Sequence, residues 1–463
     1  MKFEFRIILY AAIAGLLCCF FFSFEINQKS CRNKNNVWVL ADLNSLSLTA
    51  REKATVCVKS ESETTAPISW TYSNTATATV KNGDIYPNAP SILYDGMPKI
   101  GHVLPDLTLN DAGAYVDDGL MVHRPGSLVM LNKFYALAHR LVRYRFNPSP
   151  GTICIFQTDK KDFTLKVDII GKKMFVLTNP ETAVDVPFLK GGKDYDVEII
   201  RNYQKMTVRI LDAERKDSTE VTIVNDGTGG VGQGVVNQNT FSVGLGHDYY
   251  CFGVERGSMT VKRITVVAPK KVVRLLIYGD SITEPEAYYP TSLFPSAWTQ
   301  MIIKKLDGDA ISSGRSGYTI NEVNNYIRNE LPYIKAKYVM VTIGTNGGNT
   351  ESNLIDLINF IQSYDAIPIL NNIPCNESGT QMNENAVIDK VRRNLNLNGV
   401  RFDLATSLDG DGKEVDKTMM FWENYPPTQY NGWQVWHHPN DKGSKAMFEQ
   451  ALNDVPEVFD NIQ

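Results

Sequence analysis

The sequence predicts a fold of two parts, an antiparallel β-sandwich followed by an α/β domain built on a parallel sheet. Up to about residue 268, short β-branched and aromatic segments follow one another at regular spacing, with compact turns between them and no helical pattern. After residue 271, apolar strand-like segments alternate with segments of helical periodicity. The chain has 463 residues, which is enough for two or three domains.

The N-terminus has the pattern of an export signal. Lys2 and Arg6 precede an uncharged apolar run of 18 residues that ends at Phe24. The run is also just long enough to span a bilayer, and two adjacent cysteines within it raise the alternative of lipid attachment. We therefore expect residues 1–30 to be a signal peptide or a membrane anchor. The rest of the chain is expected to be exported, to the periplasm, the cell surface or the medium.

Residues 31–268 are predicted to form the sandwich. Leu141 to Phe146 alternates apolar and polar side chains, and the Pro- and Gly-containing segment after it is typical of a turn. Further strands are expected over 152–156, 163–170, 173–178, 195–201, 205–211, 219–224, 240–244 and 258–267. This rhythm resembles the jelly rolls of the concanavalin and laminin-G type, which often accompany carbohydrate-active enzymes. Residues 32–130 either complete the sandwich or form a separate small β module before it.

Residues 271–463 are predicted to form the α/β domain. Strands are expected over 272–278, 338–343 and 367–373, and helices over 292–306, 320–331, 354–361, 384–395 and 442–455. Because these strands are almost continuously apolar, the sheet should be covered by helices on both faces. Asp441 is expected to be the N-cap of the last helix, since Asp accepts backbone N–H bonds at that position.

Several junctions in this second part carry residues that suit acyl transfer. The first strand runs into Gly-Asp-Ser at 279–281, the next junction contains Gly317, and a later strand ends in Gly-Thr-Asn at 344–346. A His-Pro-Asn segment at 438–440 precedes the last helix. The carboxyl ends of parallel strands gather at one edge of the sheet, so these residues are expected to lie close together.

An acyl-transfer site needs a nucleophile, a base within hydrogen-bond reach, and donors aimed at the developing oxyanion. The sequence offers Ser281 as the nucleophile and His438, in preference to His437, as the base. The backbone N–H groups of Ser281 and Gly317 and the side-chain amide of Asn346 are the candidate oxyanion donors. Phosphate-loop and dinucleotide-binding glycine patterns do not occur after these strands.

Taken in order, these segments resemble the conserved blocks of the SGNH/GDSL hydrolase family. The resemblance covers about residues 271–460, with Ser281 in the nucleophile block, Gly317 in the second, Asn346 in the third and His438 in the last. It implies a flavodoxin-like α/β/α fold, oxyanion roles for Gly317 and Asn346, and no metal or organic cofactor.

One position departs from the family pattern. The family usually has an Asp three residues before the catalytic His, where this chain has Val435 before His438 and Gln434 before His437. The imidazole is therefore expected to be oriented by a backbone carbonyl or by an acid from elsewhere, such as Glu423.

Charge and cysteine content narrow the function further. The formal net charge is −4 and no basic block stands out, so a nucleic-acid partner has no electrostatic basis. Beyond residue 30 the cysteines are five in number and scattered, without a C-x-x-C pair. A zinc site and a dense disulfide framework are therefore not expected.

These features predict an exported serine esterase that removes O-acyl groups, above all O-acetyl, from a polysaccharide or oligosaccharide through an acyl-enzyme on Ser281. Trp433 and Trp436 are available either to stack on a sugar or to pack in the core. A lipid-directed esterase or lysophospholipase on the same residues is one alternative. A glycan-binding protein with weak catalysis is the other alternative, because Val435 occupies the position at which the family usually has an Asp.

Overall fold

In a computed structural model, the chain divides into two compact units, Met1–Asn88 and Ala89–Gln463. Within the first unit the structure describes only four short strands, β1 (Ala54–Thr55), β2 (Ser69–Thr71), β3 (Thr77–Lys81) and β4 (Asp84–Asn88), in one antiparallel sheet of order β1-β4-β3-β2. Within the second unit it describes residues 90–159, 163–177, 181–224, 249–424 and 432–460. The predicted export segment and the predicted strand 240–244 lie outside the described residues. No helix of the described part is long and apolar enough to cross a membrane.

The antiparallel β-sandwich predicted from the strand rhythm is present in the second unit. Its strands are β5 (Ser91–Gly96), β6 (Leu107–Thr108), β7 (Gly113–Val116), β8 (Gly119–Val122), β9 (Leu128–Leu131), β10 (His139–Pro148), β11 (Ile153–Thr158), β12 (Thr164–Asp168), β13 (Lys173–Val176), β14 (Thr182–Asp185), β15 (Tyr195–Asn202), β16 (Lys205–Asp212), β17 (Ser218–Val224), β18 (Tyr250–Arg256) and β19 (Met259–Ala268). One sheet has the order β17-β16-β15-β10-β19-β8-β7, with β5 also paired to β19, and the other has the order β14-β13-β12-β11-β18-β9-β6. Residues 91–131 thus belong to the sandwich, and the division of the chain falls between Asn88 and Ala89.

Aromatic side chains fill the space between the two sheets. The alternation predicted for β10 places Tyr144 and Phe146 in the interior, where both are almost fully buried. The Tyr144 ring lies 4.9 Å from that of Phe156 on β11 and 5.6 Å from that of Phe252 on β18. These tilted ring pairs join opposite sheets and account for the alternation of buried and half-buried residues along β10.

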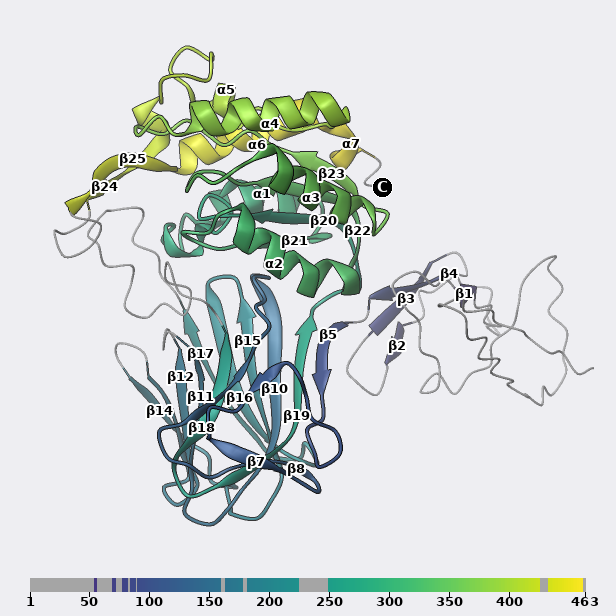
Figure 1. The fold of residues 1–463 in the computed structure, drawn as a ribbon, viewed down its shortest axis with the longest axis vertical. Coiled ribbons are helices and arrows are strands. Elements are labelled where there is room, and N and C mark those ends of the chain that lie inside the picture. The colour runs from purple at the N-terminus through teal and green to yellow at the C-terminus, as the bar shows by residue number, and fades with distance from the viewer. Residues whose placement is uncertain are drawn as a thin grey trace, which may run out of the picture. The chain divides into compact units, whose positions relative to one another are not determined.

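The parallel sheet predicted for the C-terminal part is also present (Figure 1). Its strands are β20 (Val272–Gly279), β21 (Ala310–Gly314), β22 (Lys335–Thr342) and β23 (Ile367–Leu370), in the order β21-β20-β22-β23. The helices are α1 (Trp298–Lys305), α2 (Ile320–Glu330), α3 (Glu351–Gln362), α4 (Gln381–Leu395), α5 (Phe402–Thr406), α6 (Asp441–Asp454) and α7 (Pro456–Phe459). This order is that of the first four strands of a flavodoxin-like sheet.

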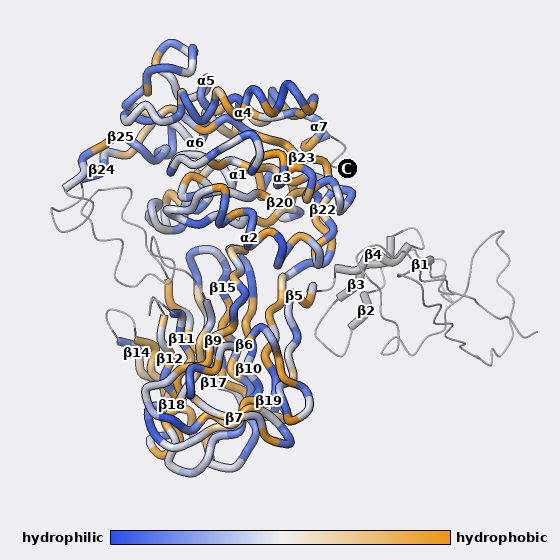
Figure 2. The backbone as a smooth tube through the Cα atoms, in the orientation of Figure 1, coloured by the Kyte–Doolittle hydropathy of each residue, from blue (hydrophilic) through white to orange (hydrophobic). Residues whose placement is uncertain are grey.

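Alternate residues of the central strand β20 face different helices. Leu276 and Tyr278 pack in the core that contains α2, α3 and α4, whereas Leu275 and Ile277 pack in the core that contains α1, α5, α6 and α7. Figure 2 shows hydrophobic residues concentrated along the strands of this sheet. Because both faces of the strands are covered, the strands read as continuous apolar runs in the sequence.

Two details differ from the expectations. The helix predicted over 292–306 begins only at Trp298, because Pro295 lies in a separate 3₁₀ turn (Phe294–Ser296) and Ala297 is extended. The N-cap of α6 is Asn440 and not Asp441, since the Asn440 side chain accepts bonds from the N–H groups of Lys442 and Gly443.

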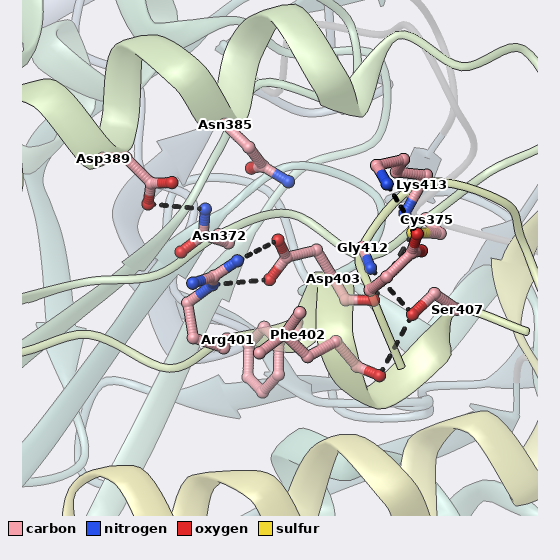
Figure 3. Close-up of polar contacts among 12 residues, drawn as sticks. Asn372, Cys375, Asn385, Asp389, Arg401, Phe402, Asp403, Ser407, Gly412 and Lys413 are labelled. Atoms are coloured by element: carbon pink, nitrogen blue, oxygen red, sulfur yellow. Dashed lines mark hydrogen bonds and ion pairs between the residues drawn. The ribbon is translucent and has the colours of Figure 1, made fainter. Parts of the chain in front are cut away.

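Polar contacts replace a regular fifth strand beside β23 (Figure 3). There the chain makes only two isolated parallel bridges, Ile369 to Asn398 and Asn372 to Arg401. Arg401 donates two hydrogen bonds to Asp403, of 3.0 and 2.8 Å, and Asn372 donates one of 3.0 Å to Asp389 on α4. The Asn372–Asp389 bond attaches α4 to the edge of the sheet, and the two bridges attach the segment leading into α5.

Candidate active site

Ser281 lies in a tight turn at the carboxyl end of the central strand β20. The N–H groups of Thr283 and Glu284 both donate to the Asp280 carbonyl, at 3.0 and 3.2 Å. A Cβ at Gly279 would lie 2.3 Å from the Thr342 carbonyl oxygen on the neighbouring strand β22, so only glycine fits there. The glycine thus allows the close strand approach that brings the Ser281 turn to this edge of the sheet.

The histidine lies on a two-stranded hairpin that the sequence did not reveal. Strands β24 (Met420–Asn424) and β25 (Gln434–Pro439) pair antiparallel, and His438 is near the end of β25. In this register Glu423 lies directly opposite Val435, the position at which the family pattern has its Asp. The hairpin therefore supplies a carboxylate from the adjacent strand at that place.

Ser281, His438 and Glu423 form a continuous chain of hydrogen bonds. The Ser281 Oγ lies 2.8 Å from His438 Nε2, and His438 Nδ1 lies 2.5 Å from Glu423 Oε1. The same carboxylate oxygen accepts the backbone N–H of His438 at 3.0 Å. The three residues are 4, 5 and 1% exposed, so their hydrogen bonds operate in a region of low dielectric.

The geometry fixes which imidazole nitrogen carries the proton. An ionised carboxylate only accepts hydrogen bonds, so the proton between His438 and Glu423 belongs on Nδ1. The lone pair of Nε2 then faces the Ser281 hydroxyl and can take its proton. A serine activated in this way is a nucleophile for carbonyl carbon.

Asp280 ties the nucleophile turn to the segment after β22. Its Oδ1 accepts the N–H of Ile282 at 3.0 Å, and its Oδ2 accepts the N–H of Thr345 at 3.2 Å. Burial raises the pKa of Asp280 to about 6, although those N–H bonds act in the opposite direction. The segment at 344–346 is therefore held beside Ser281, as the meeting of strand ends predicts.

The two remaining predicted site residues, Gly317 and Asn346, lie in segments that are joined by a hydrogen bond. Gly317 has a φ of +77°, which favours glycine. The Asn346 side-chain Nδ2 donates a bond of 2.9 Å to the carbonyl of Tyr318, the residue after Gly317. A primary amide has two N–H donors, so this bond leaves one to act on a ligand. The roles of Gly317 and Asn346 as oxyanion donors stay a prediction.

His437 is placed differently from His438. Its ring makes a T-shaped contact with that of His438, at 4.6 Å between centroids, and another with Trp433, at 5.1 Å. Burial lowers the pKa of His437 to about 3, so the imidazole is neutral in the folded protein. It is His438, the preferred candidate, that contacts Ser281.

Three further residues support the site and were missed in the sequence. The Tyr288 ring stacks on the His438 ring at 3.8 Å between centroids, and its hydroxyl lies 2.8 Å from Ser316 Oγ. The Glu284 carboxylate accepts the N–H of Ser316 at 2.7 Å. Proximity to the Gly-Asp-Ser segment was the one signal for Glu284 and Tyr288, and sequence alone does not show that a Glu is buried.

A small cavity, of about 10 Å³, lies beside the nucleophile and the base. It is lined by Ser281, Ile282, Pro285, Tyr288, Tyr289, Trp298, His438, Pro439 and Ser444. Within the described residues, no three His, Cys, Asp or Glu side chains are grouped as ligands of a metal ion would be.

Comparisons with known proteins give structural neighbours of two kinds, all with TM-scores of about 0.3. No family model and no curated protein matches the chain. A GDSL-like lipase from Bacteroides thetaiotaomicron is 15% identical with a TM-score of 0.30, over 41% of this chain and 89% of that one. A putative acylhydrolase from Bacteroides fragilis is 15% identical with a TM-score of 0.29, over 41% of this chain and 88% of that one. The exoplasmic/lumenal domain of VIP36, in its Ca²⁺/Man2-bound form, is 6% identical with a TM-score of 0.30, over 38% and 88%.

Proposed function

We propose that the protein is a serine esterase of the SGNH/GDSL type that removes O-acyl groups from carbohydrate. The observation that carries the proposal is the buried chain of hydrogen bonds from Ser281 through His438 to Glu423. In proteins this arrangement serves acyl transfer, because it raises the nucleophilicity of a hydroxyl and stores its proton for the leaving group.

The reaction follows from these positions. Ser281 Oγ attacks the ester carbonyl while its proton passes to His438 Nε2, and Glu423 stabilises the imidazolium. The N–H groups of Ser281 and Gly317 and the free N–H of the Asn346 amide hold the oxyanion of the tetrahedral intermediate. His438 then protonates the leaving alcohol, and water releases the acyl group from Ser281 by the same steps in reverse. These steps require no metal or organic cofactor.

Exposed tryptophans support a carbohydrate substrate. Trp422 is 42% exposed and Trp433 is 37% exposed, although large apolar side chains are usually buried. Trp422 pairs with Trp436 across the hairpin, at 5.2 Å between ring centroids, and Trp433 contacts the ring of His437, at 5.1 Å. Exposed indoles beside a site offer flat apolar surfaces on which the CH faces of a sugar ring can pack.

The cavity beside Ser281 has room for about one water molecule and does not select among acyl groups, so acetyl is proposed as the acyl group that the sequence predicts. The expected export of the chain, from the pattern of residues 1–30, would bring it to polysaccharides outside the cytoplasm.

The first test measures acetate release from acetylated polysaccharides, and the hydrolysis of 4-nitrophenyl acetate against the palmitate ester. We expect turnover of the acetyl substrates, with kcat reduced by at least about 1,000-fold in Ser281→Ala. Preference for the palmitate ester would favour a lipid-directed esterase instead. Binding of glycans without Ser281-dependent turnover would favour a glycan-binding protein.

The second test addresses the tryptophans. Trp422→Ala is expected to raise KM for acetylated polysaccharide several-fold, about 1 kcal/mol or more of binding, while kcat/KM for 4-nitrophenyl acetate stays near the wild-type value. Tyr333→Ala, which removes an aromatic side chain of similar exposure elsewhere, is the matched control. An unchanged KM for the polysaccharide in Trp422→Ala would count against stacking at this surface.

A further inference from the structure

The sandwich contributes two buried polar side chains to the surroundings of Ser281. Arg201 lies at the end of β15, and Gln204 lies in the turn between β15 and β16. They are only 3 and 4% exposed, and the hydrogen bonds of both reach the α/β domain. A β-turn that served only to join two strands would not need to bury an arginine and a glutamine in a neighbouring domain.

Arg201 bonds to the carboxylate that joins the nucleophile turn to the Gly317 segment. Its Nη2 lies 3.0 Å from Glu284 Oε1, and Arg315 Nη1 reaches the same oxygen at 2.5 Å. Glu284 Oε2 accepts the N–H of Ser316, and the Glu284 N–H donates to the Ser281 carbonyl at 3.2 Å. One buried carboxylate thus connects Ser281 with the residue before Gly317, and a sandwich arginine is one of the two cations that pair with it.

Gln204 bonds to the segment that packs on the base. Its Nε2 donates to the Tyr289 carbonyl at 2.6 Å. The preceding residue, Tyr288, stacks on His438 and contacts Ser316. The two sandwich side chains therefore reach both segments that enclose the Ser281 hydroxyl, through different bonds.

From these contacts we infer that Arg201 and Gln204 are positioning residues of the proposed esterase, so that the sandwich holds the Ser316–Gly317 and Tyr288–Tyr289 segments in the geometry for catalysis. The inference rests on the proposed function and adds a role for the sandwich in kcat. A buried carboxylate deprived of one of its two cations will relax towards water or other donors, and the Ser316 N–H moves with it. A displacement of about 1 Å at a catalytic site can cost roughly 100-fold in rate.

The experiment compares Arg201→Met, Arg201→Lys and Gln204→Met with the wild type in the full chain, by kcat and KM for 4-nitrophenyl acetate and by thermal unfolding. We expect kcat to fall about 10- to 100-fold in Arg201→Met, with KM within about threefold. Arg201→Lys should recover part of that loss because it restores the charge. Gln204→Met leaves no buried charge without a partner, and it should lower kcat by about tenfold.

The matched control is Arg145→Met, which removes a bidentate pair with the buried Asp196 inside the sandwich. It should lower the unfolding temperature and leave kcat unchanged well below that temperature. A folded Arg201→Met with kcat within twofold of wild type would overturn the inference. If Arg201→Met does not fold, an unchanged kcat in Gln204→Met overturns it. A wild-type protein without Ser281-dependent turnover would instead refute the proposed function, and the inference with it.

Discussion

At the scale of single residues, Glu423 takes the place of a carboxylate three positions before the histidine. It lies opposite Val435 in the hairpin and contacts both the backbone N–H and the Nδ1 of His438. The sequence suggested Glu423 only as one possible acid, because nothing in the spacing of 423 and 438 reveals the strand register that joins them. Ser281 and His438 were candidates from the sequence, since one follows a predicted strand and the other precedes the last predicted helix, each in a short local motif.

Glu423→Gln tests this orienting role. The substitution keeps the side-chain shape, but an amide can present its N–H to Nδ1 and so favour the wrong imidazole tautomer. We expect kcat for 4-nitrophenyl acetate to fall by about 100- to 10,000-fold, with little change in KM. Glu377→Gln is the control, since Glu377 accepts the N–H of Trp436 in the same hairpin but is exposed and does not contact the imidazole. Loss of less than about fivefold in Glu423→Gln would contradict the role.

The buried imidazole of His437 should make the free energy of unfolding depend on pH. Its pKa is about 3 in the folded protein and close to 6.5 when unfolded, so the unfolded chain binds the extra proton between these values. The stability that the neutral imidazole contributes is complete above pH 6.5 and is lost as the pH falls, by up to about 1.4 kcal/mol per pH unit.

We expect the free energy of unfolding of the wild type, relative to His437→Phe, to drop by about 2–3 kcal/mol between pH 6.5 and 4.5. Urea unfolding of both proteins at several pH values measures this difference. The exposed His123, replaced by Phe in the same way, is the matched control. Parallel curves for His437→Phe would show that the imidazole takes up its proton without unfolding.

At the scale of elements, periodicity predicted most strands and helices and missed the hairpin of β24 and β25. Helix α2 was predictable because its apolar residues repeat at helical spacing, and a capping box at Thr319 and Glu322 fixes its start. The hairpin has no such signal, since Trp, His and Pro crowd β25 and its two buried histidines are polar residues. Its structure depends on contacts with Ser281 and with α6, which no local pattern encodes.

The N-cap of α6 is the contact that anchors the hairpin. Asn440 caps α6 through its Oδ1, and its Nδ2 donates to the carbonyls of Thr418 and Met420, at 3.0 and 3.1 Å. Asn440→Ala is expected to cost about 1–2 kcal/mol of stability and to lower kcat, because His438 lies two residues earlier. Asp441→Asn, at the first helical position, should have a smaller effect on both. Chemical denaturation and kcat measure the two effects, and equal losses in both variants would argue against the anchor.

At the scale of the whole molecule, the sandwich and the α/β domain share one hydrophobic core. A single cluster of buried residues includes sandwich residues such as Phe156 and helix residues such as Val323. Across this core, the Glu330 carboxylate on α2 accepts the N–H groups of Ala136 and Leu137, at 2.5 and 3.0 Å. The pattern of the sequence predicted two domains but not the hydrophobic core that they share, because the contacts between them join residues almost 200 positions apart.

A shared core predicts that the two parts unfold together. Phe156→Ala removes a fully buried ring from the sandwich and should cost about 3–5 kcal/mol. We expect Ser281-dependent turnover and the near-ultraviolet signal of the sandwich aromatics to be lost in one transition, at the same lowered temperature. Turnover that persists after the aromatic signal has gone would show that the domains are independent.

The account depends above all on Ser281 being a nucleophile activated by His438. The most direct measurement is intact-protein mass spectrometry after brief treatment with a fluorophosphonate, which phosphonylates activated serines. We predict a single adduct, located at Ser281 by peptide mapping, absent in Ser281→Ala and strongly slowed in His438→Asn. No adduct on the folded wild type, or an adduct that persists in Ser281→Ala, would contradict the hydrolase assignment.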